Sequence, residues 1–115
     1  MAESVLFVGW NRPIVGREAR AVELFNSFLG YLGKQQQQGN VESFEPVFLN
    51  VHGGDINGFI VVRGDRSKLS TLRNTNDFLD LVTQVDVNVE NFGVVDGWTG
   101  EGVKVQLNRY QNAIK

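Results

Sequence analysis

A hairpin signal near the middle of the chain constrains the fold more than any other stretch. Residues 41–65 (VESFEPVFLNVHGGDINGFIVVRGD) contain two apolar runs separated by a loop rich in glycine, aspartate and asparagine. Such loop residues tolerate the positive φ angles that turns between antiparallel strands require. Pro46 in the first run lacks an N–H, so that strand is predicted to lie at a sheet edge. The second run, residues 58–63, contains no proline and is predicted to be a central strand.

An apolar run and an amphipathic segment precede the hairpin. Residues 4–10 (SVLFVGW) are rich in β-favouring residues, which predicts a central strand covered on both faces. Residues 16–33 carry apolar side chains three and four positions apart, the spacing of an amphipathic helix. Gly30 and Gly33 each weaken a helix by about 1 kcal/mol relative to alanine, which predicts either fraying there or a close neighbour.

A broken helix is predicted after the hairpin. Asp65 or Ser67 is a suitable N-cap for a helix that begins near Lys68. The polar residues 74–77 then compete for backbone hydrogen bonds. We therefore expect the helix to stop there and a second one to begin, with Thr75 as its cap.

A strand and a helix are predicted for the last third of the chain. Valines at every second position from Val85 predict a fourth strand, and a change of phase predicts a bulge near Asn91. A C-terminal helical extension is predicted at residues 99–115. Its apolar residues form a narrow stripe that needs a partner surface: Val103, Leu107, Tyr110 and Ile114.

The predicted element order is strand, helix, strand, strand, helix, strand, followed by the C-terminal helix. This order is typical of an α+β, ferredoxin-like βαββαβ fold, in which a four-stranded antiparallel sheet carries its helices on one face. At 115 residues we expect a single domain that spans residues 1–115. The strands carry bulky apolar residues on both faces, so the face without helices would expose a larger patch than soluble monomers usually do. We therefore expect a sheet-to-sheet homodimer.

Composition argues against several classes of partner. The net charge is −2 and no basic block occurs, so nucleic-acid binding has no electrostatic basis. No apolar run approaches the roughly 18 to 20 residues of a membrane span, so no membrane association is expected. The chain has no cysteine and one histidine, so we expect no metal site and no cofactor. A cytoplasmic location is the simplest interpretation.

The chain resembles the dimeric α/β-barrel superfamily in its layout, its length and the segments GFIVVRGD, DFLDLV and FGVVDGW. In that superfamily, two ferredoxin-like protomers pack sheet to sheet. Its members include cofactor-independent monooxygenases, muconolactone isomerase-like enzymes, haem-degrading enzymes and many small proteins without an assigned activity. The resemblance implies the fold and a homodimer, and it constrains the activity only weakly.

RNA recognition motifs share the same order of elements. Residues 6–9 (LFVG) are similar to their first-strand motif, and Gly58 with Phe59 is similar to the start of their third-strand motif. The later aromatic positions of that motif hold Val61 and Gly64, and the chain is acidic overall. RNA binding is therefore the weaker of the two interpretations.

His52, Arg12 and Asp96 are weak candidates for catalysis. His52 is the only histidine, and it is suited either to general-base chemistry or to a solvated turn. Because a glycine-rich turn holds a catalytic group poorly, the turn interpretation is favoured. Arg12 leaves the first strand after Trp10, and Asp96 leaves the fourth strand near Trp98. An antiparallel sheet would place Trp10 and Arg12 at the opposite end of the sheet from Asp96 and Trp98.

Five residues are candidates for ligand binding: Trp10, Arg12, Tyr31, Arg63 and Trp98. Tyr31 on the first helix, together with Phe28 and Trp10, would line a pocket between helix and sheet, although such aromatic residues are more often plain core. Arg63 ends the third strand and is expected to lie close enough to Asp96 for a surface ion pair.

Two functions remain open from the sequence. The first is a homodimer with a small apolar pocket in each protomer, which binds or transforms a small organic molecule without a metal. The second is a non-enzymatic dimer whose C-terminal helix and exposed edges contact other proteins. A cavity lined by Trp10, Arg12, Tyr31 or His52 would favour the first function, and a closed, fully packed interior would favour the second.

Overall fold

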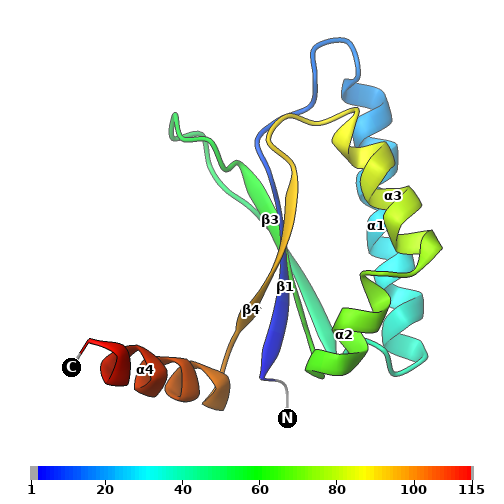
Figure 1. The fold of residues 1–115 in the computed structure, drawn as a ribbon. Helices are drawn as coiled ribbons and strands as arrows, with labels where there is room; N and C mark the ends of the chain where they lie inside the picture. The colour runs from blue at the N-terminus through cyan, green and yellow to red at the C-terminus, as the bar shows by residue number, and fades with distance from the viewer. Residues whose placement is uncertain (1–2, 115) are drawn as a thin grey trace.

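The computed structural model describes residues 3–114 and shows two layers, a twisted antiparallel sheet and a layer of helices on one of its faces (Figure 1). The strands are β1 (Ser4–Trp10), β2 (Ser43–Phe48), β3 (Gly58–Gly64) and β4 (Gly93–Trp98). The helices are α1 (Glu18–Gln37), α2 (Arg66–Leu72), α3 (Asn76–Asp86) and α4 (Glu101–Ala113). Helix α4 lies outside both layers.

The sheet has the strand order β2-β3-β1-β4, and every neighbouring pair is antiparallel. This order confirms the predicted ferredoxin-like topology, with β2 and its Pro46 at one edge and β3 in the centre. Edge placement suits Pro46, because proline has no N–H to donate to a neighbouring strand.

The core lies between the sheet and α1, α2 and α3. Alternate residues of the central strands point into it: Leu6, Val8, Ile60 and Val62 are each 1% exposed. Helix α1 contributes Leu24, Phe28 and Leu32, spaced four residues apart, so they form one stripe that faces the sheet. Leu69 and Phe78 close the core from α2 and α3.

The predicted break between α2 and α3 is confirmed, and both predicted caps are present. Asp65 accepts hydrogen bonds from the Ser67 hydroxyl (2.7 Å) and from the Lys68 N–H (3.2 Å). These bonds lower the pKa of the Asp65 carboxyl, the Ser67 bond most. The ionised Asp65 cap therefore stabilises the fold at pH values above the ordinary pKa of an aspartate. This stabilisation is lost as the pH falls through the lowered pKa of Asp65. Thr75 accepts from the Phe78 N–H at 3.3 Å at the start of α3.

Helix α1 is longer than predicted and passes through both of its glycines. It continues past the predicted end at residue 33 to Gln37, so three of the four glutamines at positions 35–38 are helical. A Cβ atom added at Gly30 or Gly33 would have nothing within 4 Å, so neither fraying nor a close neighbour explains these residues. Burial of Phe28 and Leu32 in the core holds this end of the helix instead.

Gly30→Ala should stabilise the protein by about 1 kcal/mol, because alanine loses less backbone entropy in a helix and meets no neighbour at this position. Gly39→Ala is the matched control. Gly39 is equally unobstructed, but its φ of +80° is unfavourable for alanine, so this variant should lose stability. Urea unfolding of the two variants measures both effects. A Gly30→Ala variant no more stable than the parent would contradict the prediction.

The predicted start of the fourth strand and the bulge near Asn91 are wrong. Helix α3 runs to Asp86, so Val85 ends a helical stripe rather than beginning a strand. Val89 forms only an isolated bridge with Pro13, and β4 begins at Gly93. The change of phase comes from a turn at Asn91, a non-glycine residue with a φ of 52°. Valines at every second position were misleading here because Val85 and Val89 are both buried, one in a helix and one in a loop.

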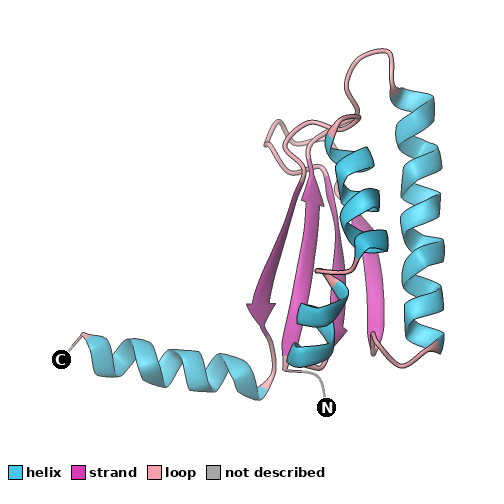
Figure 2. Cartoon of the chain, turned by 45° about the vertical axis from the view of Figure 1, so that its right-hand side comes forward, coloured by secondary structure: helices cyan, strands magenta, loops and turns pink. Residues whose placement is uncertain are grey.

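The second face of the sheet carries no helix, as Figure 2 shows. We call this surface the open face. By the strand register, its apolar members are Val5, Phe7, Val47, Phe59, Val61 and Val95. Phe7 and Phe59 stack on each other with ring centroids 5.0 Å apart. The predicted two-sided apolar sheet is therefore present. No helix within residues 3–114 is both long enough and apolar enough to cross a membrane.

Candidate functional site

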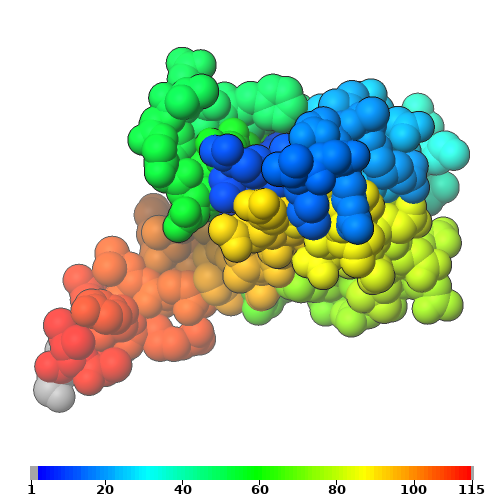
Figure 3. All heavy atoms as spheres, turned by 90° about the horizontal axis from the view of Figure 1, so that it is seen from above, coloured from blue at the N-terminus to red at the C-terminus, as the bar shows by residue number. Residues whose placement is uncertain are grey.

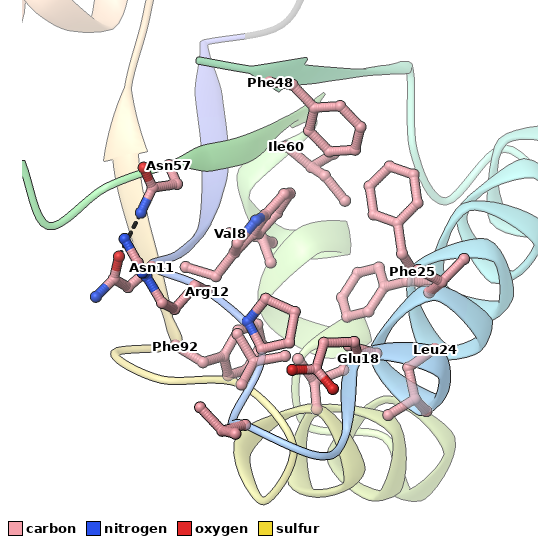
Figure 4. Close-up of a pocket in the computed structure, with 18 residues that line it drawn as sticks. Val8, Asn11, Arg12, Glu18, Leu24, Phe25, Phe48, Asn57, Ile60 and Phe92 are labelled. Carbon is pink, nitrogen blue, oxygen red and sulfur yellow. Dashed lines mark hydrogen bonds between the residues drawn. The ribbon is translucent and has the colours of Figure 1, made fainter. Parts of the chain in front are cut away.

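A cavity of about 660 Å³ opens between α1 and the helix-covered face of the sheet, at the end where β1 stops (Figure 4). Its walls are mostly apolar and come from the sheet, from α1, from the end of α3 and from the segment between α3 and β4. They include Val8, Ile60, Ala21, Val22, Leu24, Phe28, Val85, Val89 and Phe92. Cavities of this size and lining are typical of small-molecule sites.

Three aromatic rings form one side of the cavity. The Trp10 ring meets the Phe25 ring edge to face, with 5.9 Å between centroids. The centroid of the Phe48 ring lies 5.1 Å from that of Phe25 and 6.3 Å from that of Trp10. Gly58 makes room for this cluster, because a Cβ atom at that position would lie 2.6 Å from the Trp10 ring. The three rings offer both faces and edges to an apolar or aromatic ligand.

Polar groups gather on another side of the cavity, where Asn11, Arg12 and Asn57 lie together (Figure 4). Asn57 ties the start of β3 to the end of β1. Its N–H donates to the Trp10 carbonyl (2.9 Å), and its side-chain amide donates to the Asn11 side chain. Its own carbonyl accepts from the Leu49 N–H at 3.0 Å. The amide groups are therefore held in fixed positions at the cavity wall.

Two ionisable side chains line the cavity, Arg12 and Glu18. Both are exposed at the rim. The Glu18 carboxylate accepts a hydrogen bond from the Gly16 N–H at 3.0 Å. Among residues 3–114 the Arg12 guanidinium forms no salt bridge, so its charge is available to an anionic group of a ligand.

The loop that carries Arg12 is held by backbone hydrogen bonds to the segment before β4. The Asn11 N–H donates to Glu90 (2.9 Å), the Glu90 N–H donates to Arg12 (2.7 Å) and the Ile14 N–H donates to Asn88 (2.9 Å). The Arg17 guanidinium also donates to the Val87 carbonyl. This anchoring fixes the rim, so the cavity is a built feature of the fold rather than a gap under a free loop.

The structure brings Trp10 and Arg12 into the cavity, but not Tyr31. Tyr31 lies further along α1, beside Phe78 (6.2 Å between ring centroids). It lines a separate polar pocket of about 370 Å³. Burial raises the pKa of the Tyr31 hydroxyl, and a hydrogen bond with Thr75 partly opposes this. Phe28, which was expected beside Tyr31, does line the cavity.

His52 lies outside the cavity, in the loop between β2 and β3. Its Nδ1 accepts the Gly54 N–H at 3.1 Å, which leaves Nε2 to donate to the Ile56 carbonyl at 2.7 Å. These bonds use both ring nitrogens within the turn. The geometry is that of a solvated turn histidine, the interpretation favoured from the sequence.

The predicted ion pair between Arg63 and Asp96 is not formed. Arg63 is opposite Val5 and Asp96 is opposite Leu6, the next residue of β1. Because successive side chains of a strand point to opposite faces, Arg63 lies on the open face and Asp96 on the helix-covered face. Arg63 pairs instead with Glu45, at 3.7 Å.

Asp96 and Trp98 lie at the far end of the sheet from the cavity. Asp96 is 3.4 Å from Arg66 and 3.6 Å from Arg73, and Arg66 lies 4.0 Å above the Trp98 ring. Trp98 is opposite Ser4, at the start of β1, whereas Trp10 is at its end. The expected separation of the two tryptophans is confirmed. No group of three or more His, Cys, Asp or Glu side chains within residues 3–114 could hold a metal ion.

Sequence reasoning missed Phe25, Phe48, Glu18 and Asn57 as cavity residues. Phe25 and Phe48 could have been found from periodicity, because Phe25 borders the apolar stripe of α1 and Phe48 shares a face with Ile60 across the sheet. No local signal marks Asn57, whose role depends on contact with Asn11.

Comparisons with known proteins show similarity in fold but not in sequence family. No protein-family model and no curated protein sequence matches the chain. Several solved structures are similar to it, and three of them illustrate the likeness. A dimeric protein of unknown function with a ferredoxin-like fold from Bacteroides fragilis has a TM-score of 0.62 at 10% identity, over 84% of this chain and 95% of that one.

A dabb family protein with a ferredoxin-like fold from Mesorhizobium loti has a TM-score of 0.65 at 14% identity, over 84% of this chain and 96% of that one. A variant of SnoaB, a cofactor-independent oxygenase from Streptomyces nogalater, has a TM-score of 0.56 at 14% identity, over 86% of this chain and 93% of that one. At these identities the likeness establishes the ferredoxin-like fold.

Proposed function

We propose that two copies of this chain pair through their open faces and that each copy binds a small, largely apolar organic molecule in its cavity. The observation that carries the proposal is the combination of a 660 Å³ apolar cavity with a polar side made by Asn11, Arg12 and Asn57. The other ionisable group, Glu18, lies at the rim, where its carboxylate accepts the Gly16 N–H. An apolar volume supplies binding energy, and a few fixed polar groups orient the ligand.

The lining favours an aromatic ligand with one oxygen-bearing or anionic end. The ring would lie against Trp10, Phe25 and Phe48, whose planes face different directions. The polar end would lie at Arg12 and the two asparagine amides. If the ligand is transformed there, Arg12 would stabilise negative charge that develops on its oxygen. SnoaB, which shares the fold, is a cofactor-independent oxygenase.

The open face supports the homodimer. It is dominated by aliphatic and aromatic side chains, and its one arginine is paired with Glu45. A second copy would cover this patch with a matching surface. The Bacteroides fragilis protein, which shares the fold, is dimeric. RNA binding is less well supported, because the open face offers phosphates only the partly neutralised Arg63.

A cavity rather than a packed interior favours ligand binding over a role limited to protein contacts. The test is titration with an anionic aromatic fluorophore, anilinonaphthalene sulfonate. Ala21→Trp fills the cavity from α1, so it should weaken binding at least about tenfold, a difference of about 1.4 kcal/mol. Ala19→Trp, on the same helix but outside the cavity lining, is the matched control and should bind like the parent.

Arg12→Gln separates the contribution of charge from that of shape. It should weaken binding of the anionic fluorophore more than binding of a neutral naphthalene probe. Equal binding by the Ala21→Trp and Ala19→Trp variants would place the fluorophore elsewhere and would contradict the proposed site.

A further inference from the structure

Helix α4 leaves the body of the protein after Trp98 and stands apart from it (Figure 3). The radius of gyration is 15.5 Å, against about 13 Å expected for a compact chain of this length. Gly102 is the only buried residue of α4, and it lies against Trp98 and the Glu3 carbonyl at the base of the helix. Beyond that base, α4 has no packing partner within residues 3–114.

The predicted apolar stripe of α4 is present and exposed. Val103, Leu107, Tyr110 and Ile114 are 51%, 53%, 66% and 68% exposed. At about 100° per residue, these four positions fall within one narrow sector of the helix. A helix of 13 residues is marginally stable alone in water, so the stripe needs a surface to cover it.

A second unpartnered apolar group lies at the opposite end of the sheet. The loop between β2 and β3 carries Leu49, Val51 and Ile56, which are all exposed. Figures 1 and 2 show this loop and α4 on the same side of the sheet, the side of the open face, with the loop at one end of the strands and α4 at the other. The open face therefore lies between two projecting apolar elements.

A two-fold axis that runs parallel to the plane of the sheet and perpendicular to the strands would bring these elements together. It pairs the open faces and places the α4 end of one sheet over the loop end of the other. Packed sheets lie about 10 Å apart, and 13 helical residues extend about 20 Å, so α4 is long enough to pass the partner sheet. Because the axis is two-fold, the contact between α4 and the loop forms twice, once with the α4 helix of each copy.

We infer that α4 of each copy packs its apolar stripe on the β2–β3 loop of a second copy, beside the mouth of that copy's cavity. The loop carries Asp55. On α4, Lys104 already pairs with Glu101 at 3.4 Å, which leaves Arg109 as the cation for a charge contact with the loop. The loop begins directly after Phe48, which lines the cavity, so the α4 contact would lie at the same end of the sheet as the cavity.

The inference rests on the proposed dimer and adds its orientation. Without a native cysteine, the chain allows a direct proximity test. V51C and L107C chains are prepared separately, mixed, treated with a short bis-maleimide and analysed by mass spectrometry. The predicted product joins a V51C chain to an L107C chain, with little L107C–L107C product. Predominant L107C–L107C product would show α4 against α4 and would overturn the inference, as would a dimer that forms neither product.

Two aspartate substitutions on α4 give a second test in the unmodified chain. Leu107 and Val105 are each 53% exposed but lie on opposite sides of the helix. Leu107→Asp should weaken dimerisation at least about tenfold, whereas Val105→Asp should leave it unchanged. Equal effects of the two substitutions on a persisting dimer would overturn the α4 contact while leaving the sheet-to-sheet dimer intact. A monomeric parent chain would overturn both.

Discussion

Val61→Asp should separate the dimer into folded monomers. Val61 lies in the middle of the open face, opposite Phe7 on one side and Glu45 on the other. The substitution would bury two carboxylates near the two-fold axis without partners, and desolvating unpaired charges costs several kcal/mol. We expect the dissociation constant to rise at least about a hundredfold, which corresponds to roughly 2.7 kcal/mol.

Val87→Asp is the matched control for this substitution. Val87 follows α3, is 52% exposed and lies outside the sheet, so aspartate there should leave the dimer intact. Sedimentation velocity over a concentration series gives the dissociation constants, and circular dichroism checks that both variants remain folded. A Val61→Asp variant that sediments like the parent would show that the open face is not the dimer interface.

Phe28→Ala should cost about 3 to 5 kcal/mol of stability, the usual range for removing a buried aromatic ring. Phe28 is 2% exposed, packs edge to face on Phe78 with 5.9 Å between centroids, and forms part of the cavity wall. Domains of this size are stable by about 5 to 15 kcal/mol, so the variant should be close to unfolding.

Phe48→Ala makes the same change at a cavity residue that is 70% exposed, and should cost less than about 1 kcal/mol. Urea unfolding must be compared at one protein concentration, because dimerisation adds to apparent stability. Similar losses for the two variants would contradict the assignment of Phe28 to the core.

The fold was predictable because its signals are local. Pro46 marks an edge strand, Thr75 marks a helix start, and the loop after Phe48 marks a hairpin, and each depends only on neighbours in the sequence. The start of the fourth strand was mispredicted because burial gave Val85 and Val89 an apolar pattern that does not distinguish a strand from a helix followed by a loop.

The cavity was only partly predictable because its rim depends on long-range contacts. Trp10 and Arg12 follow from the end of a central strand, whereas Asn57 gains its role from Asn11, 46 residues away. The predicted ion pair between Arg63 and Asp96 is not formed, because the strand register places the two side chains on opposite faces of the sheet.

The most direct test of the proposed assembly is sedimentation equilibrium of the unmodified chain at micromolar concentration. A chain of 12.8 kDa should behave as a species of twice that mass if the open faces pair. A single species of 12.8 kDa across the concentration range would contradict the dimer and, with it, the α4 contact.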